Sequence, residues 1–215
     1  MIISPGRGYI FVHIPKTGGS SMAAALEARA HRDDILIGDT EKALRRRGRL
    51  RQLTPKGRLW KHSTLADIDG ILSPAEIADM FTFTIVRNPW DRMVSYYHWL
   101  QAQTFDHPQV ALSKQLSFGA FMANPATQAI LGVAPFSSYM RDATGREHCS
   151  AWMRLEHFAE DMAPLKAHLG FTPDMGHRNR SARRADFRGY YDDKTAAVVA
   201  IACAEDIARF GYSFD

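Results

Sequence analysis

A pair of glycines between a predicted strand and a predicted helix constrains this chain more than any other feature. Residues 9–14 form an apolar run rich in aromatic and β-branched side chains, which is typical of a buried strand. Pro15 interrupts the run, and residues 22–28 are rich in alanine and favour a helix. Between them, Gly18 and Gly19 allow the backbone to approach a ligand closely and to turn its N–H groups toward it. The sequence therefore predicts a tight strand-to-helix corner.

The side chains in this corner are those that bind an anion, most naturally a phosphate. The helix N-terminus supplies a partial positive charge, Lys16 a full charge, and Ser20 and Ser21 hydroxyl donors. In the common phosphate loop the lysine follows the second glycine, whereas Lys16 precedes Gly18 here. The residues alone leave two interpretations open, an anion cradle and an ordinary turn with a surface lysine.

A second strand-to-helix corner follows. Residues 81–86 are predicted to form a buried strand, and Pro89 is typical of a first helical residue. Arg87 leaves the strand end, where its planar fork of donors matches phosphate oxygens, and Ser95 lies about two helical turns further on. The alternative is a structural ion pair between Arg87 and Asp91, with Ser95 only packing.

Together the two corners resemble the PAPS-dependent sulfotransferases, where PAPS is 3′-phosphoadenosine 5′-phosphosulfate. Residues 13–21, His-Ile-Pro-Lys-Thr-Gly-Gly-Ser-Ser, are similar to the 5′-phosphosulfate-binding loop of the glycan-modifying branch of that family. Arg87 and Ser95 have the spacing of its 3′-phosphate motif. The resemblance spans nearly the whole chain. It implies an α/β fold of three layers, P-loop-like, with a central parallel sheet flanked by helices, in a single domain of residues 1–215.

The resemblance also implies a role for each motif residue. Lys16 would stabilise charge on the bridging and leaving oxygens, and Arg87 and Ser95 would hold the 3′-phosphate. The 5′-phosphate would be held by the loop residues Thr17, Gly18, Gly19, Ser20 and Ser21. Family members often carry an Asn-x-Ser/Thr pattern near the cofactor, which Asn179 and Ser181 match, although a plain linker fits them equally well.

His62 is the candidate catalytic base. It is predicted to end a short extended segment just before a helix, and strand ends in open α/β sheets are where ligands bind. Imidazole suits proton transfer near neutral pH, and the family often has His followed by Ser or Thr between its two cofactor motifs. The alternative is a structural histidine, and His98 and His107 are weaker candidates for the base.

The remaining elements are predicted from local patterns. Residues 150–155 favour a third strand, and residues 156–170 an amphipathic helix that Pro164 kinks or breaks. Residues 194–210 favour a terminal helix capped by Asp192 or the residue after it.

Composition limits the class of protein. With 215 residues, 46% of them hydrophobic and 23% charged, the chain has the make-up of an ordinary globular protein. Cys149 and Cys203 lie far apart and form neither a metal-ligand set nor a disulfide framework. No apolar run approaches the roughly 20 residues of a membrane span, and the first residues lack a signal-peptide layout. The sequence therefore predicts a cytoplasmic protein without stable membrane insertion. Because eukaryotic members of the glycan branch that it resembles are usually anchored in the Golgi membrane, the resemblance implies an enzyme of the soluble bacterial type.

The most basic stretch, residues 42–58, has two interpretations. It is either a solvated surface or a landing surface for a polyanion, such as an anionic glycan, the cofactor or nucleic acid. Nucleic acid is disfavoured, because Trp60 is the only aromatic residue nearby for base stacking.

The sequence thus predicts an O-sulfotransferase that moves a sulfuryl group from PAPS to an acceptor hydroxyl without a metal. A carbohydrate acceptor is favoured over another small molecule, because the loop resembles the glycan branch. Two other functions stay open. A P-loop-like nucleotide kinase or NTPase is disfavoured by the place of Lys16 and by the lack of a clear strand-end Asp for Mg²⁺. A non-catalytic polyanion-binding protein would use residues 42–58. The oligomeric state cannot be derived from the sequence.

Overall fold

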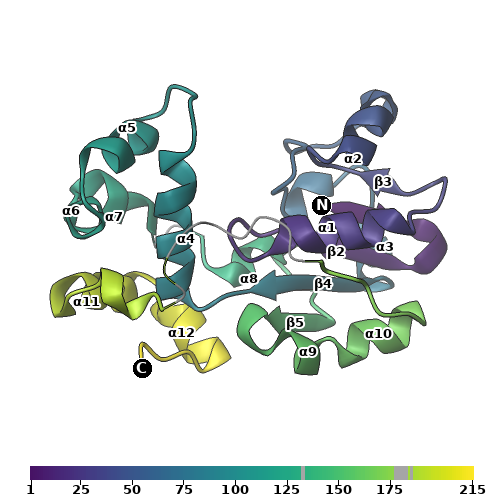
Figure 1. The fold of residues 1–215 in the computed structure, drawn as a ribbon. Helices are drawn as coiled ribbons and strands as arrows, with labels where there is room; N and C mark the ends of the chain where they lie inside the picture. Colours follow the sequence, from purple (N-terminus) through teal and green to yellow (C-terminus); the bar gives the residue numbers. More distant parts are fainter. Residues whose placement is uncertain (132–133, 177–183, 185) are drawn as a thin grey trace. The chain divides into compact units, whose positions relative to one another are not determined.

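A five-stranded sheet organises one of the two units of the chain (Figure 1). The computed structural model describes residues 1–131, 134–176, 184 and 186–215. The chain forms two units, the first from residues 1–86 and 136–179 and the second from residues 87–135 and 180–215. Each unit is described by itself, and the single domain predicted over the whole chain stays a prediction.

Three neighbouring strands of the sheet are parallel. The strands are β1 (Ile2–Ser4), β2 (Tyr9–Val12), β3 (Ile35–Leu36), β4 (Phe81–Val86) and β5 (Ala151–Arg154), in the order β3-β1-β2-β4-β5. Strands β2, β4 and β5 pair in parallel, with Phe11 opposite Phe83 and Phe83 opposite Ala151. This confirms the predicted central parallel sheet and the boundaries of the strand at residues 81–86.

Strand β1 was not predicted, and it is antiparallel to both of its neighbours. The reversal between β1 and β2 is made by the 3₁₀ turn η1 (Pro5–Arg7) and by Gly8, whose φ of 61° is one that glycine adopts easily. A tight turn of this kind can join only antiparallel strands. The sheet is therefore mixed at one edge and parallel at its centre.

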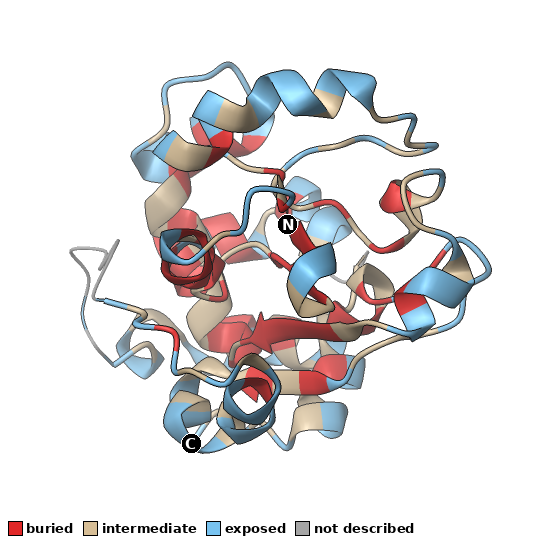
Figure 2. Cartoon of the chain, turned by 90° about the vertical axis from the view of Figure 1, so that its right-hand side faces the viewer, coloured by how far each residue is buried: buried red, intermediate tan, exposed pale blue. Residues whose placement is uncertain are grey.

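The alternation of side chains along β2 builds the predicted three layers. Tyr9 and Phe11 face one buried cluster, which includes Leu26 and Leu165. These two leucines come from α1 (Gly19–Ala28) and α10 (Ala163–Leu169). Ile10 and Val12 face the other cluster, with side chains from η3 (Ala66–Ile68), α3 (Pro74–Ala78) and the loop after α8 (Phe136–Tyr139). Figure 2 shows the strands buried and the outer surfaces of the helices exposed.

Local signals explain where most helices begin. Ser73 and Glu76 form a reciprocal capping box at α3, and Asn88 caps α4 (Pro89–Gln101), whose first residue is Pro89 as predicted. Asp192 caps α11 (Asp193–Ala202) in the same way. The first unit also contains α2 (Glu41–Arg46), η2 (Arg47–Gln52), η4 (Leu155–His157) and α9 (Phe158–Asp161).

The second unit is helical in its described part, with its own core around Trp90, Tyr97 and Phe121. Its other helices are α5 (Pro108–Gln115), α6 (Phe118–Ala123), α7 (Pro125–Leu131), η5 (Arg188–Tyr190) and α12 (Ala204–Phe210).

Two predicted helices are split. The helix predicted for residues 156–170 breaks at Met162 into α9 and α10, because Pro164 can occupy only the first turn of a helix. Its predicted end at Gly170 is confirmed, with φ 72°. The terminal helix predicted for residues 194–210 divides at Cys203, whose ψ of 23° departs from helical geometry.

Candidate active site

The corner between β2 and α1 holds the first motif, and its backbone is strained at Lys16. In the described part of the chain, Lys16 is the one residue other than glycine with a positive φ, 65°. This conformation costs a lysine about 1–2 kcal/mol, and such strain concentrates at functional sites. Thr17 holds the turn, because its buried hydroxyl donates a hydrogen bond to the Ile14 carbonyl oxygen at 2.9 Å. The lysine side chain thus starts from a fixed turn directly before the helix.

Helix α1 begins at Gly19, after Gly18 in the left-handed conformation with φ 91°. Within the helix, Ser21 N–H donates to the Gly18 carbonyl oxygen at 3.1 Å. The N–H groups of Gly19 and Ser20 precede that bond, at the end of the helix that carries partial positive charge. Ser20 is exposed and Ser21 is buried. The corner therefore offers backbone N–H groups and one exposed hydroxyl to an anion.

Packing inside the protein also requires both glycines. A Cβ on Gly19 would lie 2.1 Å from Cδ2 of His13, and a Cβ on Gly18 would lie 2.9 Å from Cδ1 of Leu155. Close-packed interiors have no room for such contacts without movement of the neighbours. The prediction that these glycines serve the approach of a ligand is thus incomplete, because Gly19 makes room for a histidine ring.

His62 is held next to this corner by a hydrogen bond to its backbone. Nδ1 of His62 lies 2.7 Å from the carbonyl oxygen of His13. Because a carbonyl oxygen only accepts, Nδ1 carries the proton and Nε2 is the nitrogen that can accept one. Burial lowers the pKa of His62 to about 4, and the bond to the His13 carbonyl opposes that shift. His62 is therefore uncharged at neutral pH, which is the state that a general base needs.

The path by which His62 reaches the corner differs from the predicted one. Residues 53–64 contain no strand, and the 3₁₀ turn η3 follows them instead of an α-helix. A reciprocal pair of hydrogen bonds precedes η3, since Thr64 N–H donates to Asp67 at 2.8 Å and Asp67 N–H donates to Thr64 Oγ1 at 3.2 Å. His62 is therefore placed by an irregular loop rather than by a strand end.

His13 connects the β2–α1 corner, called the anion loop for its predicted ligand, to His62, although no role beyond the motif was predicted for His13. Its ring is buried, and its centroid lies 4.6 Å from that of His62 at an interplanar angle of 69°. Burial, and then the neighbouring His62, lower the pKa of His13 well below its ordinary value. A neutral His13 thus packs between Gly19 and His62. The available signal was its place directly after a buried strand.

The second motif lies in the second unit, at the start of α4. Nε and Nη2 of Arg87 donate to Oδ2 of Asp91 at 2.8 and 2.6 Å, and both side chains are largely buried. Ser95, also buried, is one helical turn beyond Asp91 on the same face of the helix. The ion pair that was the alternative interpretation is therefore present. It orients the guanidinium of Arg87 along this face of α4.

The other candidates from the sequence have different surroundings. Asn179 and Ser181 lie outside the described residues. His107 caps α5, with Nδ1 accepting a hydrogen bond from Gln109 N–H at 3.2 Å. His98 packs edge-on against tyrosine rings of the second unit. Of the three histidines considered as the base, His62 is the one that belongs to the same unit as the Lys16 corner, and it lies next to that corner.

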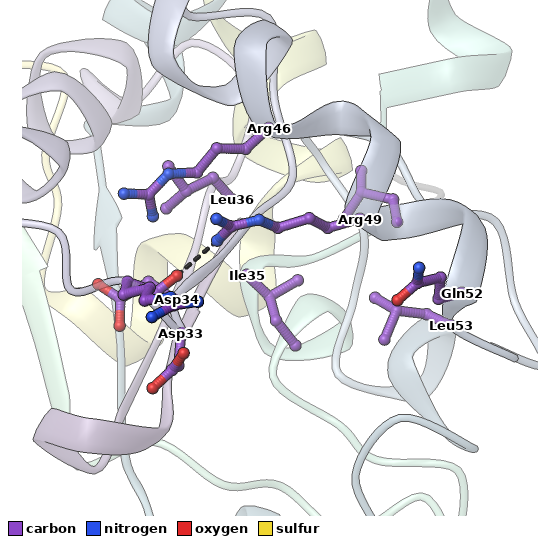
Figure 3. A pocket seen from close by; sticks show the side chains of 10 residues that line it. Asp33, Asp34, Ile35, Leu36, Arg46, Arg49, Gln52 and Leu53 are labelled. Atoms are coloured by element: carbon purple, nitrogen blue, oxygen red, sulfur yellow. Dashed lines mark hydrogen bonds between the residues drawn. The ribbon is translucent and has the colours of Figure 1, made fainter.

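The basic stretch of residues 42–58 includes a separate pocket at the edge of the sheet. Figure 3 shows Arg46 and Arg49 above the start of β3, in a pocket of about 490 Å³. Arg46 donates to the His31 carbonyl oxygen at 2.8 Å, and Arg49 donates to that of Arg32. These bonds fasten α2 and η2 to the chain before β3.

This pocket is remote from the Lys16 corner. Strands β2 and β3 run in the same direction, because both are antiparallel to β1. The residues before β3 therefore lie at the end of the sheet where β2 begins, opposite the end where β2 leads into the Lys16 corner. Helix α1 runs from the Lys16 corner back toward that other end of the sheet, and its ten residues span about 15 Å.

Among the residues that the structure describes, no three His, Cys, Asp or Glu side chains are grouped as metal ligands. The helices described here also include none with the length and apolar character needed to cross a membrane.

Comparison with known proteins identifies the family. A family model described as "Sulfotransferase family" matches residues 1–194. No curated protein matches this sequence. Among solved structures, the crystal structure of mouse sulfotransferase SULT7A1 complexed with PAP is 15% identical, over 95% of this chain and 67% of that chain. Its TM-score of 0.37 is too low to support conclusions about this chain. Because the family model covers 194 of 215 residues, the chain belongs to the sulfotransferase family and is a PAPS-dependent sulfotransferase.

Proposed function

We propose that this sulfotransferase moves a sulfuryl group from PAPS to a hydroxyl group of a carbohydrate. The observation that carries the proposal is the hydrogen bond of 2.7 Å between His62 Nδ1 and the His13 carbonyl oxygen. This bond leaves Nε2 as a proton acceptor, on a ring that packs against His13 and so adjoins the anion loop. Family membership supplies the reaction class, and the glycan-type sequence of residues 13–21 favours a carbohydrate.

In this proposal the β2–α1 corner binds the 5′-phosphosulfate. Backbone N–H groups from Thr17 to Ser20 and the hydroxyl of Ser20 donate to phosphate oxygens, and the N-terminus of α1 favours their charge. Lys16 stabilises the bridging oxygen between phosphorus and sulfur, where negative charge grows as the sulfuryl group leaves. The strained backbone of Lys16 supports this role, because it fixes where the side chain begins.

His62 acts on the acceptor. Nε2 takes the proton from the acceptor hydroxyl while that oxygen forms a bond to sulfur. The bond between sulfur and the bridging oxygen breaks, and its electron pair stays on the 5′-phosphate of adenosine 3′,5′-bisphosphate (PAP). In such in-line transfers the protein contributes mainly positioning and charge stabilisation.

Arg87 and Ser95 bind the 3′-phosphate in this proposal. The planar guanidinium of Arg87 has five N–H donors, and two of them are directed at Oδ2 of Asp91. Asp91 thus acts as a positioning residue for a side chain that would otherwise choose among many rotamers. Recognition of the 3′-phosphate is what would distinguish PAPS from ATP.

The decisive experiment compares nucleotides before any acceptor is known. Isothermal titration calorimetry with PAP and with ATP, with and without Mg²⁺, is expected to show binding of PAP and weak or no binding of ATP. Transfer from ³⁵S-labelled PAPS is then measured on a panel of glycans, with His62→Gln as the matched variant that keeps a polar side chain. The proposal fails if ATP with Mg²⁺ binds more tightly than PAP, because that outcome favours a nucleotide kinase or NTPase.

A further inference from the structure

An exposed tryptophan lies directly beside the proposed base. Trp60 is 41% exposed, one of few large apolar side chains in the described chain left so accessible. Its ring centroid lies 5.0 Å from that of His62, at an interplanar angle of 86°. The exposed part of the indole adjoins the proposed base, so a ligand that covered it would gain the free energy of burying apolar surface.

A cation accompanies this aromatic surface. The guanidinium carbon of Arg58 lies 5.2 Å from the centroid of the Trp60 ring, within the range of a cation–π contact. Arg58 is exposed, and no ion pair with a carboxylate is found for it among the described residues. Its charge is therefore available to an anion that lies against Trp60.

The loop that carries both side chains is held rigidly. The hydroxyl of Ser63 is fully buried, accepts a hydrogen bond from Trp60 N–H at 2.9 Å, and lies 2.9 Å from the Arg58 carbonyl oxygen. A further bond joins Ser63 N–H to the Trp60 carbonyl oxygen at 3.0 Å. Lys61, the residue after Trp60, forms an ion pair with Asp39, whose Oδ2 lies 2.7 Å from Nζ of the lysine. Rigid presentation of exposed side chains is typical of a binding surface rather than of a mobile connection.

We infer that Arg58 and Trp60 form the acceptor subsite, and that they select a sugar ring bearing a carboxylate or sulfate group. This inference rests on the proposed function, because it places the acceptor at the nitrogen of His62 that takes the proton. The C–H face of the sugar packs on the exposed indole, and its acidic group pairs with Arg58. The acceptor class is therefore an acidic glycan rather than a neutral one.

Two other uses of Trp60 make different predictions. A platform for the adenine ring would not need Arg58, because adenine is uncharged, but it would make PAP binding depend on the indole. A structural cover for His62 would affect the pH dependence of transfer and the stability of the fold instead of acceptor binding.

The test uses hyaluronan oligosaccharides, which alternate uronic acid with amino sugar, and the same oligosaccharides with their carboxyl groups reduced to alcohols. Calorimetry of the full chain with these probes needs no PAPS and no turnover. Trp60→Ala is expected to weaken binding of both probes about tenfold, as loss of roughly 50 Å² of buried apolar contact implies. Trp60→Phe should retain most of the binding.

Arg58→Ala is expected to weaken the carboxylate form about fivefold at low salt and to leave the reduced form unchanged. Arg51→Ala is the matched control, an exposed arginine of the same stretch outside the subsite, and should change neither. The inference is wrong if Trp60→Ala weakens PAP instead of the oligosaccharides, or if Arg58→Ala affects both probes equally. If PAP fails to bind while the oligosaccharides bind through Trp60, the proposed function falls and the subsite remains.

Discussion

Gly19 provides the sharpest test of how the anion loop and the base are connected. Gly19→Ala adds one methyl group, which would lie 2.1, 2.6 and 2.8 Å from Cδ2, Nε2 and Cγ of His13. An ordinary contact begins near 3.4 Å, so the ring must move by about 1.3 Å for the closest of these atoms. The substitution therefore acts on His13, and through its ring and carbonyl oxygen on His62.

Two opposing effects set the magnitude of this change. Alanine suits a helix better than glycine by about 0.5–1 kcal/mol, and Gly19 is the first residue of α1. Overpacking of a buried site costs about 1–3 kcal/mol. The cost of overpacking is the larger of the two, because the His13 ring is buried, stacked on Phe11 with centroids 6.0 Å apart, and also in contact with the ring of His62. We expect a net loss of about 1–2 kcal/mol in the free energy of unfolding.

Urea denaturation measures this loss, and a double-mutant cycle assigns it to one contact. His13→Ala alone leaves a cavity, but combined with Gly19→Ala it gives the new methyl group room, so the double variant should lose less stability than the two single variants together. Gly48→Ala is the control, because a Cβ there meets nothing within 4 Å. If Gly19→Ala is as stable as the wild type and shows no coupling with His13→Ala, the packing argument is refuted.

The remaining predictions concern single groups of the site. Lys16→Ala should lower turnover of labelled PAPS about 10²–10³-fold, as loss of one transition-state donor does, while PAP still binds. Arg87→Ala should weaken PAP binding about tenfold or more in calorimetry, and wild-type affinity would contradict its assignment to the 3′-phosphate. Burial lowers the pKa of His62 to about 4, so between pH 4 and 6.5 the unfolded chain binds more protons and stability falls as the pH falls. His62→Gln should remove up to about 3 kcal/mol of that pH dependence in urea titrations, and an unchanged profile would show that His62 is not buried as described.

The sequence predicts the parts of the fold whose causes are local. The apolar run at residues 81–86 and the Asn-Pro pair after it specify β4, its end and the start of α4, and the structure agrees with each boundary. Likewise Pro164 and Gly170 mark a break and a helix end that the structure contains. These signals act within a few residues, so no tertiary information is needed to use them.

What the sequence did not predict depends on contacts between distant residues. Strand β1 has only three residues, too few for a periodic pattern, and it exists because β2 and β3 pair with it on both sides. The bond that fixes the tautomer of His62 joins residues 49 positions apart. No separate role was predicted for His13, because no sequence pattern around a histidine that follows a strand shows whether its ring packs in the core or binds a ligand.

Trp60 was weighed only as a platform for nucleic-acid bases, because its neighbours in the sequence are basic. The role proposed for Trp60 depends on geometry, since its indole contacts the ring of His62 and the guanidinium of Arg58 lies over its face. A turn held by hydrogen bonds of the Ser63 hydroxyl brings these three side chains together. No sequence pattern at Ser63 predicts those hydrogen bonds.

In the proposed mechanism, one buried ring couples binding of the anion to the proton transfer. Gly19 begins the helix whose N–H groups would face the proposed anion. His13 occupies the space that a Cβ at Gly19 would fill, and its carbonyl oxygen fixes the tautomer of His62. A shift of the loop on phosphosulfate binding would therefore move the ring and the carbonyl oxygen on which the base depends. Substitutions in the loop should then alter the pH dependence of transfer as well as affinity for PAP, whereas substitutions at Arg87 should alter affinity alone. An Arg87 variant with a changed pH profile would contradict this division of roles.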